Sequence, residues 1–335
     1  MLFWGSLLKK VNVGLIGLGY QGKTYLRNLL RLENANVLGV ADLSKKALNF
    51  AKNAGVENVF SDYHDLVKVD ELDAVVISLP NFLHFDGVLA AAEAGKAILL
   101  DKPLARDVEE GEKILSTVRK NNVRLMMGYN LRFHPALRGI HEKIADGFFG
   151  EVQIAEATNV SAGPFASRSD HVGPVSVPSW WYDKKLAGGG ALLDLGSHMI
   201  DLLSWYFGEV DRLECYLGYM FNMDLEDTAT CMLKFKNGPI ASVKVGWFSR
   251  DFTQTVQICG AAKNVGLRVY PLTPSKLIWS DVKRKLGQSD DGPNYLELKY
   301  FVNCVHNDEQ PNPSGDDGLR CMQVVSQAYE KGVKV

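Results

Sequence analysis

The chain has 335 residues, of which 46% are hydrophobic and 23% charged, and its formal net charge is -2. At about 100–200 residues per domain, this length predicts two domains, and the composition is that of a globular protein with a real core. No excess of lysine and arginine is present to neutralise phosphates, which argues against a nucleic-acid partner. The longest basic cluster, residues 283–285, is interpreted as a solvated surface.

Five cysteines are present, an odd number at wide spacing with no C-x-x-C pair. This pattern disfavours a disulfide framework and a zinc site. Cys304 and His306 are close in sequence, but two ligands do not hold a metal, so no metal is expected. Free thiols are typical of a reducing cytoplasm.

The apolar residues 1–8 are too few to span a membrane, and the two lysines of this segment follow the apolar residues instead of preceding them. The segment therefore predicts an extension before the first strand and no membrane association.

Short apolar runs alternate with amphipathic stretches between residues 11 and 128. The runs predict strands at residues 11–16, 37–41, 59–60, 73–79, 97–100 and 123–127. The stretches predict a helix from the turn at 17–22 to about 32, and further helices at 47–53, 83–94 and 108–120. Nearly all-apolar strands that alternate with helices indicate a parallel sheet covered on both faces. The first region is therefore expected to be an α/β domain with a doubly wound parallel sheet.

The pattern changes after about residue 150. Half-exposed alternating runs predict strands at residues 151–160, 212–220, 228–235, 240–246, 253–259 and 265–270, and Asn237-Gly238 predicts a hairpin turn between two of them. Helices are expected at 192–207, 295–305 and 318–331. These elements predict an α+β domain with a large, mostly antiparallel open sheet that carries helices on one face. Residues 163–178 are rich in glycine, proline and serine and predict a long loop, a length that is often functional.

The first motif that carries chemistry is Gly17-x-Gly19-x-x-Gly22, which follows the first strand and opens a helix. The first glycine permits a tight turn, the second lets the backbone approach a pyrophosphate, and the third lets helix and strand pack closely. The helix N-terminus then favours the phosphate charge. Asp42 ends the second strand, where a carboxylate accepts hydrogen bonds from the ribose hydroxyls and favours NAD. The lysines three and four residues beyond it leave NADP open.

A second motif, Leu79-Pro80-Asn81, ends the strongest predicted strand. Ligands of open α/β sheets bind outside such strand ends. Asn81 is expected to face the cofactor or to cap the following helix. His84 would lie in the first turn of that helix, near the cofactor, unless it is simply a buried or exposed histidine.

A third motif, Asp101-Lys102-Pro103, follows the next strand. Pro103 holds Lys102 in an extended conformation at the strand end. A lysine that is partly desolvated there can exchange protons at neutral pH. The alternative role for Lys102 is that of a surface lysine.

The fourth motif begins at residues 188–190, which are all glycine, and continues along a mostly apolar helix. Asp194, His198 and Asp201 are spaced i, i+4 and i+7 and are predicted to share one face of that helix. Ionisable groups on a largely buried helix need partners or a function. A satisfied core histidine is the alternative to a catalytic one, and the glycines would let a ligand approach.

These motifs, in this order, resemble the glucose-fructose oxidoreductase / inositol dehydrogenase / rhizopine catabolism (Gfo/Idh/MocA) family. The matching segments cover nearly the whole chain and are residues 17–22, Pro80-Asn81-x-x-His84, Lys102-Pro103, residues 128–135 and Asp194-x-x-x-His198. The family usually has Glu-Lys-Pro where this chain has Asp101-Lys102-Pro103. The resemblance implies an NAD(P)-binding Rossmann domain at residues 1–128, with 1–10 as an extension. It also implies an α+β domain at 129–335 that binds substrate and forms a homodimer or homotetramer through its sheet.

By the same resemblance, the enzyme would transfer a hydride between nicotinamide and a secondary alcohol of a sugar, cyclitol or sugar derivative. His198 would be the general base, Lys102 would polarise the oxygen, and Asp194 would orient the substrate or the imidazole. The expected cofactor contacts are Gly17, Gly19, Tyr20, Gln21, Gly22, Asp42, Leu79, Pro80, Asn81, His84, Asp101, Lys102, Asn130 and Arg132. The expected substrate contacts are Lys102, Tyr129, Trp181, Asp194 and His198, with Trp180 as an alternative to Trp181 and core or interface packing as the other role of both tryptophans.

Two other functions fit the same motifs. A redox-neutral glycosidase would oxidise and re-reduce one sugar carbon with bound NAD and release no net NADH. A regulatory protein would keep the cofactor site alone, but the complete set of Lys102, Asp194 and His198 argues against it. The substrate stays open, because Arg168 and His171 in the predicted loop could recognise a sugar phosphate or nucleotide sugar, or the loop could simply cover the site.

Overall fold

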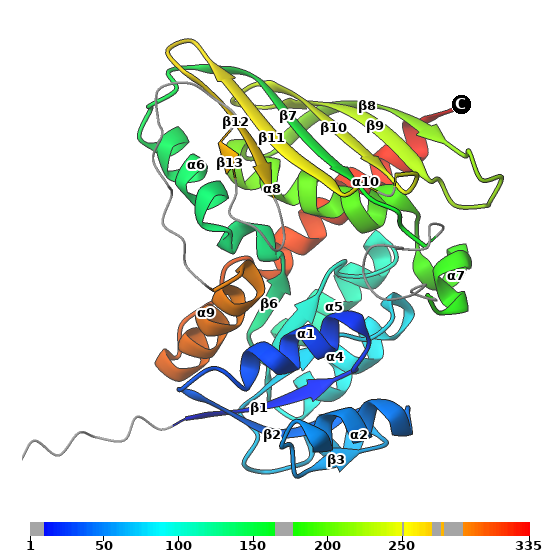
Figure 1. The fold of residues 1–335 in the computed structure, drawn as a ribbon, viewed down its shortest axis with the longest axis vertical. Coiled ribbons are helices and arrows are strands. Elements are labelled where there is room, and N and C mark those ends of the chain that lie inside the picture. Colours follow the sequence, from blue (N-terminus) through cyan, green and yellow to red (C-terminus); the bar gives the residue numbers. More distant parts are fainter. Residues whose placement is uncertain (1–9, 165–176, 250, 270–275, 278–290) are drawn as a thin grey trace, which may run out of the picture.

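In the computed structural model, which describes residues 10–164, 177–249, 251–269, 276–277 and 291–335, the chain forms two sheets (Figure 1). The first sheet is wholly parallel, in the order β3-β2-β1-β4-β5-β6. Its strands are β1 (Val11–Ile16), β2 (Ala35–Ala41), β3 (Val59–Phe60), β4 (Ala74–Ile77), β5 (Ala97–Asp101) and β6 (Leu125–Gly128). The strand order reverses between β1 and β4, which is the point where open α/β sheets bind ligands. The predicted doubly wound sheet is confirmed.

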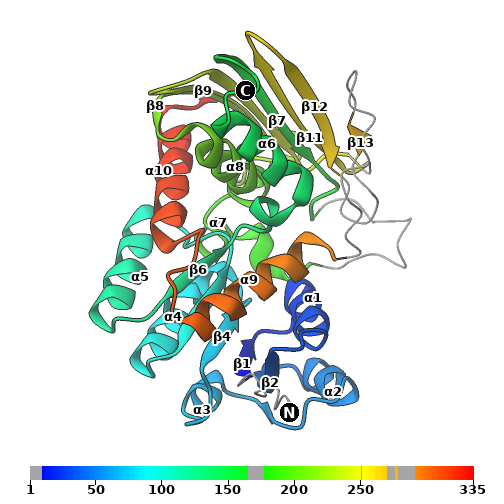
Figure 2. The ribbon, with the colours of Figure 1, turned by 90° about the vertical axis from the view of Figure 1, so that its left-hand side faces the viewer.

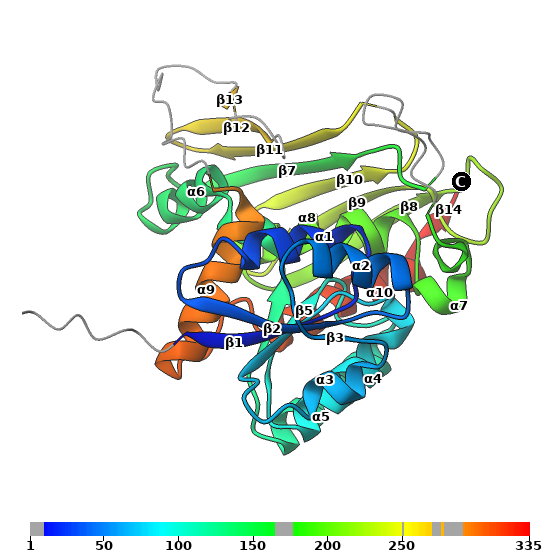
Figure 3. The ribbon, with the colours of Figure 1, turned by 60° about the horizontal axis from the view of Figure 1, so that its bottom comes forward.

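Helices cover both faces of this sheet, which explains why β4 has no exposed residue. They are α1 (Tyr20–Leu29), α2 (Lys45–Asn53), α3 (Tyr63–Val67), α4 (His84–Glu93) and α5 (Val108–Lys120). Figure 3 shows α3, α4 and α5 on one face and α1 and α2 on the other. Ser44 and Asp107 cap α2 and α5 with their side chains, and this capping determines where these helices begin. The short helix α3 was not predicted.

The second sheet has the order β13-β12-β11-β7-β10-β9-β8-β14. Its strands are β7 (Val152–Val160), β8 (Val210–Gly218), β9 (Thr228–Phe235), β10 (Ile240–Gly246), β11 (Thr253–Gly260), β12 (Asn264–Val269), β13 (Lys276–Leu277) and β14 (Val333–Lys334). Only the β7/β10 and β8/β14 pairs are parallel among the described strands. The mostly antiparallel sheet is therefore also confirmed.

Three helices pack on one face of the second sheet and leave the other face open (Figures 2 and 3). They are α6 (Pro135–Ala145), α8 (Ser197–Phe207) and α10 (Gly315–Lys331). The alternation of buried and exposed residues along β9 reflects this one-sided cover. Helix α6 was not predicted. None of the helices that the structure describes is long and apolar enough to cross a membrane.

Helix α9 (Pro293–Asn307), which the sequence analysis included in the second domain, packs against the first. Leu298, Phe301 and Val302 lie in one buried cluster with Val13 and Leu15 of β1. The chain thus returns to the layer of the first sheet after β13 and then goes back to the second sheet with α10 and β14. Several predicted features lie outside the described residues: the extension at 1–9, Arg168 and His171, Tyr270 at the end of a predicted strand, and the basic cluster at 283–285.

Candidate active site

A crevice of about 1290 Å³ runs along the carboxyl ends of the parallel strands and reaches the second domain. Its wall contains predicted residues from all four motifs and from the segment after β6. These are Gly17, Gly19, Tyr20, Gln21, Asp42, Leu79, Pro80, Asn81, Asp101, Lys102, Asn130, Trp180, Trp181, Asp194 and His198. Motifs that are far apart in the sequence therefore meet in one place.

The glycine turn is shaped for close approach of a phosphate. Gly17 has a φ of +90°, and a Cβ there would lie 2.3 Å from the carbonyl oxygen of Ser78. Gly22 acts through packing, outside the crevice wall, because its Cβ would lie 2.0 Å from the Gly17 carbonyl oxygen. A Cβ on Gly19 would instead meet open space, at the N-cap of α1 where no side chain caps the helix. The N-H groups of the first turn are thus available to an anion, so these residues fit the pyrophosphate of NAD.

Asp42 is held rigidly at the end of β2. Its Oδ2 accepts the backbone N-H of Leu18 at 2.7 Å and its Oδ1 accepts that of Ser44 at 2.7 Å. Each oxygen retains a lone pair for a ribose hydroxyl. The lysines just beyond Asp42, which were expected to be available for a 2′-phosphate, are absent from the crevice wall, whereas Lys23 and Arg27 of α1 form part of it.

Lys102 is bound by a single residue of the second domain. Its Nζ donates to Asp194 Oδ1 at 2.5 Å and to the Asp194 carbonyl oxygen at 2.9 Å. Asp194 lies in a π-helical turn, η4 (Leu192–Gly196), that leads into α8. Such turns occur frequently at functional sites. Here the turn presents both the carbonyl and the carboxylate of Asp194 to Lys102, and this was not visible in a sequence that predicted one continuous helix.

Trp247 is a member of the site that sequence reasoning missed. It follows β10, its side chain is almost wholly buried, and its Nε1 donates to Asp194 Oδ2 at 3.1 Å. Both carboxylate oxygens of Asp194 therefore have a donor. No local signal identifies this partner, because the two residues are 53 positions apart in the sequence.

His198 lies one turn beyond Asp194 and lines the crevice. Desolvation and the nearby ammonium of Lys102 lower the pKa of His198 to about 3, so the imidazole is neutral at neutral pH. Its Nδ1 has no hydrogen-bond partner within the described part of the chain. The neutral imidazole offers a lone pair to a substrate hydroxyl, and a pKa this far below neutral makes it a weak base until negative charge develops on the bound substrate.

Asp101 precedes Lys102 in the chain, and its carboxylate binds the backbone of Lys102. Its Oδ1 accepts the backbone N-H of Lys102 at 2.9 Å, and its Oδ2 accepts the hydroxyl of Ser78 at 3.2 Å. Burial raises the pKa of Asp101 to about 6, although the positive charge of Lys102 opposes the shift. Asp101 therefore titrates closer to neutral pH than an ordinary aspartate does.

Arg132, which was predicted to contact the cofactor, is absent from the crevice wall. It is buried, and its guanidinium donates to both oxygens of Asp201, at 2.9 and 2.6 Å, and to Asp317 at 3.2 Å. Burial alone would lower the pKa of Arg132, but the two carboxylates raise it. Asp201 is thereby turned away from the face of Asp194 and His198.

Tyr129, predicted to contact substrate, is wholly buried and lies outside the crevice wall.

The side chains of His84 and Asn81 bind backbone carbonyl oxygens of neighbouring loops. The two ring nitrogens of His84 lie 2.9 Å from the carbonyl oxygen of Pro103 and 3.0 Å from that of Leu79. Buried His84 thus connects the second and third motifs, as the alternative of a buried histidine predicted, and it is absent from the crevice wall. Asn81 lines the crevice but donates its amide to the Ala187 carbonyl oxygen at 2.7 Å, which joins the two domains.

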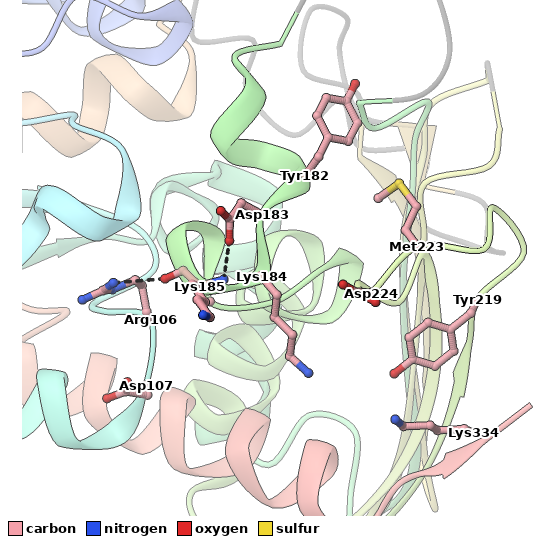
Figure 4. Close-up of a pocket in the computed structure, with 11 residues that line it drawn as sticks. Arg106, Asp107, Tyr182, Asp183, Lys184, Lys185, Tyr219, Met223, Asp224 and Lys334 are labelled. Atoms are coloured by element: carbon pink, nitrogen blue, oxygen red, sulfur yellow. Dashed lines mark hydrogen bonds between the residues drawn. The ribbon is translucent and has the colours of Figure 1, made fainter.

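A second hollow, of about 1120 Å³, lies behind the short helix α7 (Lys184–Ala187) (Figure 4). Figure 4 shows Lys184, Lys334, Tyr219 and Asp224 around this space. Lysines and aspartates alternate in its wall, and Arg106 there is already paired with Glu110. This hollow brings together no acid-base pair comparable to Lys102 and His198, so the crevice is the candidate active site.

The sheet order, the glycine turn and the strand-end carboxylate define a Rossmann-type dinucleotide-binding protein, whose crevice is lined by residues of both domains. The comparisons agree, because residues 11–129 match the oxidoreductase family with an NAD-binding Rossmann fold and residues 137–265 match the Gfo/Idh/MocA C-terminal domain. The chain belongs to the Gfo/Idh/MocA family of oxidoreductases, as the motifs predicted. Its cofactor is a nicotinamide dinucleotide.

Individual relatives are similar over most of the chain. The levoglucosan dehydrogenase of Pseudarthrobacter phenanthrenivorans is 29% identical over 270 residues, which cover 71% of this chain and 67% of the relative. The myo-inositol 2-dehydrogenase of Thermotoga maritima is 25% identical over 335 residues, which cover 92% of each protein. A solved levoglucosan dehydrogenase in complex with NADH and L-sorbose has a TM-score of 0.83 at 23% identity and covers 97% of this chain and 98% of that one.

Proposed function

We propose that this oxidoreductase transfers a hydride between NAD and a secondary alcohol of a sugar, cyclitol or sugar derivative. The observation that carries the proposal is the crevice in which Lys102, held by Asp194, lies with a neutral His198 beside the dinucleotide turn. Relatives named as dehydrogenases of levoglucosan and myo-inositol support the substrate class. NAD is favoured over NADP because Asp42 presents a carboxylate where a 2′-phosphate would lie.

In this mechanism the chain's own residues handle the proton. The bound cofactor supplies a hydride acceptor at its nicotinamide ring. The substrate hydroxyl binds between Lys102 Nζ and the imidazole of His198, which accepts the hydroxyl proton. Lys102 stabilises the negative charge that develops on the oxygen. Asp194 orients the ammonium of Lys102, and Trp247 fixes Asp194 in turn.

The experiment is NADH formation with NAD and a panel of inositols, aldoses, sugar phosphates and nucleotide sugars, with Lys102→Ala run beside it. The matched control is Lys113→Ala, since Lys113 is an exposed lysine that pairs with Glu109 on the surface of α5. We expect activity with at least one class of substrate, reduced in Lys102→Ala by about 10²–10⁴-fold with little change in NADH affinity. Equal loss of turnover and of NADH binding in Lys102→Ala would contradict the assignment.

The two alternatives give distinct results in the same assay. Release of a free sugar from glycosides without net NADH would indicate the redox-neutral glycosidase. Bound NADH with no turnover of any substrate would indicate the regulatory protein.

The open face of the second sheet supports a homodimer or homotetramer. Ile154 and Ile240, neighbours in register on β7 and β10, are 61% and 48% exposed there. Tyr216 and Met232 add further exposed apolar surface on β8 and β9. Light scattering should give the mass of a dimer or tetramer for the parent protein and a smaller mass for Ile240→Glu. The mass of a single chain for the parent protein would contradict this assembly.

The five free cysteines support a reducing, cytoplasmic location, which cell fractionation can check.

A further inference from the structure

A row of four aromatic rings lines the crevice next to the acid-base residues. Phe82 and Trp180 have ring centroids 6.2 Å apart, Trp180 and Trp181 5.3 Å apart, and Trp181 and Trp247 6.1 Å apart. All four line the same crevice as Lys102. We call these four residues the aromatic wall.

The aromatic wall has a buried end and an accessible end. Trp247 is 1% exposed, supports Trp181 and binds Asp194 through its indole N-H. Phe82, Trp180 and Trp181 are only partly buried, in the short helices η1 (Asn81–Leu83) and η3 (Ser179–Tyr182). Their free surfaces can therefore pack against a ligand. Because Phe82 comes from the first domain and the tryptophans from the second, the wall extends across both domains.

The substrate end of the crevice offers no free cation among the described residues. Its described wall residues from position 177 to position 247 include neither lysine nor arginine. The ammonium of Lys102, which also lines the crevice, is already bound twice by Asp194. Lys23 and Arg27 lie at the other end, with the dinucleotide turn and Asp42. A substrate phosphate bound beside His198 would therefore find, among the described wall residues, none of the free arginine or lysine partners that such groups normally have.

We propose that the aromatic wall selects an uncharged pyranose-type sugar, which packs a face of C-H groups against Trp180 and Trp181. This proposal rests on the proposed function and names its substrate class. The C-H face of such a ring is apolar and is buried favourably against aromatic side chains. Packed in this way, the ring hydroxyls project from its edge toward Asp194 and His198. The described wall offers no free cation for the phosphate of a sugar phosphate or nucleotide sugar.

The test compares substrate classes in the holoenzyme with NAD. The probes are D-glucose, D-xylose and 1,6-anhydroglucose as uncharged rings, and glucose 6-phosphate and UDP-glucose as charged ones. The variants are Trp181→Leu, which removes the ring, and Trp181→Phe, which retains an aromatic ring. Phe82→Leu is a second variant at the wall in case Trp181→Leu does not fold, and Phe248→Leu is its control, since Phe248 is exposed and absent from the crevice wall. Thermal melting and NADH affinity verify that each variant folds.

We expect the best uncharged ring to exceed every charged probe in kcat/KM by at least about tenfold. Trp181→Leu should raise KM for that sugar by about tenfold with kcat nearly constant, because packing acts equally on the bound and the reacting sugar. Trp181→Phe keeps an aromatic ring, so its KM should be close to that of the parent protein. Faster turnover of a charged probe would overturn the substrate class but leave hydride transfer intact. An unchanged KM in Trp181→Leu would overturn the role of the wall. No turnover of these probes, while an inositol of the first panel is oxidised, would overturn the pyranose class alone. No turnover of the inositols either, with NADH still bound, would count against the proposed function itself.

Discussion

The indole nitrogen of Trp247 donates to Asp194 Oδ2 at 3.1 Å, while Lys102 holds the other oxygen of the same carboxylate at 2.5 Å. A carboxylate with both oxygens engaged by buried or half-buried donors has little freedom to rotate. The orientation of the Lys102 ammonium therefore depends on an aromatic residue from another part of the chain.

Trp247→Phe tests this dependence, because it removes the N-H donor and keeps a ring in the core. We expect kcat to fall by about tenfold or more, as for the loss of a hydrogen bond to a charged group, with NADH affinity unchanged. The measurement is steady-state turnover beside NADH titration. Trp205→Phe is the matched control, since Trp205 stacks on His141 away from the crevice wall. A kcat that falls equally in both variants would argue for a general loss of stability instead.

The pKa of Asp101 predicts how activity depends on pH. With a pKa raised to about 6 by burial, Asp101 is a carboxylate above that pH and is protonated below it. We expect kcat/KM for alcohol oxidation to fall as the pH decreases through about 6, because Lys102 then loses the negative charge beneath it. His198, with its pKa lowered to about 3, adds no transition near its ordinary value. Asp101→Asn should remove the transition, and a profile that keeps it would contradict the assignment.

The same raised pKa predicts a stability effect of defined sign. The native state binds the Asp101 proton more tightly than the unfolded state does, so the stabilisation is complete below the unfolded pKa and is lost as pH rises through about 6. Thermal melting between pH 4 and pH 7 should therefore show a smaller decrease of Tm with rising pH in Asp101→Asn than in the parent protein. Equal slopes in both proteins would show that Asp101 does not titrate in this range.

Because Arg132 is buried and absent from the crevice wall, we expect its replacement to lower the stability of the protein without changing its affinity for NADH. Arg132→Met leaves Asp201 and Asp317 without their shared cation, and breaking such a buried pair costs about 3–5 kcal/mol. Denaturant unfolding should show this loss, and Arg132→Met combined with Asp201→Leu should recover part of it. NADH affinity should stay constant wherever the variant is folded. Weaker NADH binding by the folded variant would restore the cofactor role that the sequence suggested.

Substitutions at two glycines of the dinucleotide turn should affect NADH binding and stability separately. Gly19→Ala adds a methyl group in open space, so we expect an unchanged Tm and weaker NADH binding as the methyl group obstructs the pyrophosphate. Gly22→Ala places a methyl group 2.0 Å from a backbone oxygen, so we expect a large loss of stability. Differential scanning fluorimetry and NADH titration of the two variants distinguish these effects. A strong decrease of Tm in Gly19→Ala would contradict the expected division.

Much of the first domain was predictable because its signals are local. An apolar run followed by closely spaced glycines determines the path of β1, the turn and α1, and Asp42 follows from the length of one helix and one strand. The spacing of Asp194 and His198 likewise identified two site residues on one helix. In contrast, the sequence pattern predicted a regular helix where the structure has the π-helical turn η4, because apolar periodicity does not distinguish the two.

The sequence by itself determined the two kinds of sheet, the dinucleotide turn and the placement of Asp194 and His198 one helical turn apart, since each depends on neighbours along the chain. Only the tertiary structure decided which polar groups meet across the fold. Arg132 binds Asp201, 69 residues away, Trp247 binds Asp194, and α9 returns to the first domain. The physical reason is that a buried charge or N-H group must find a partner wherever packing places one, and packing is a property of the whole chain.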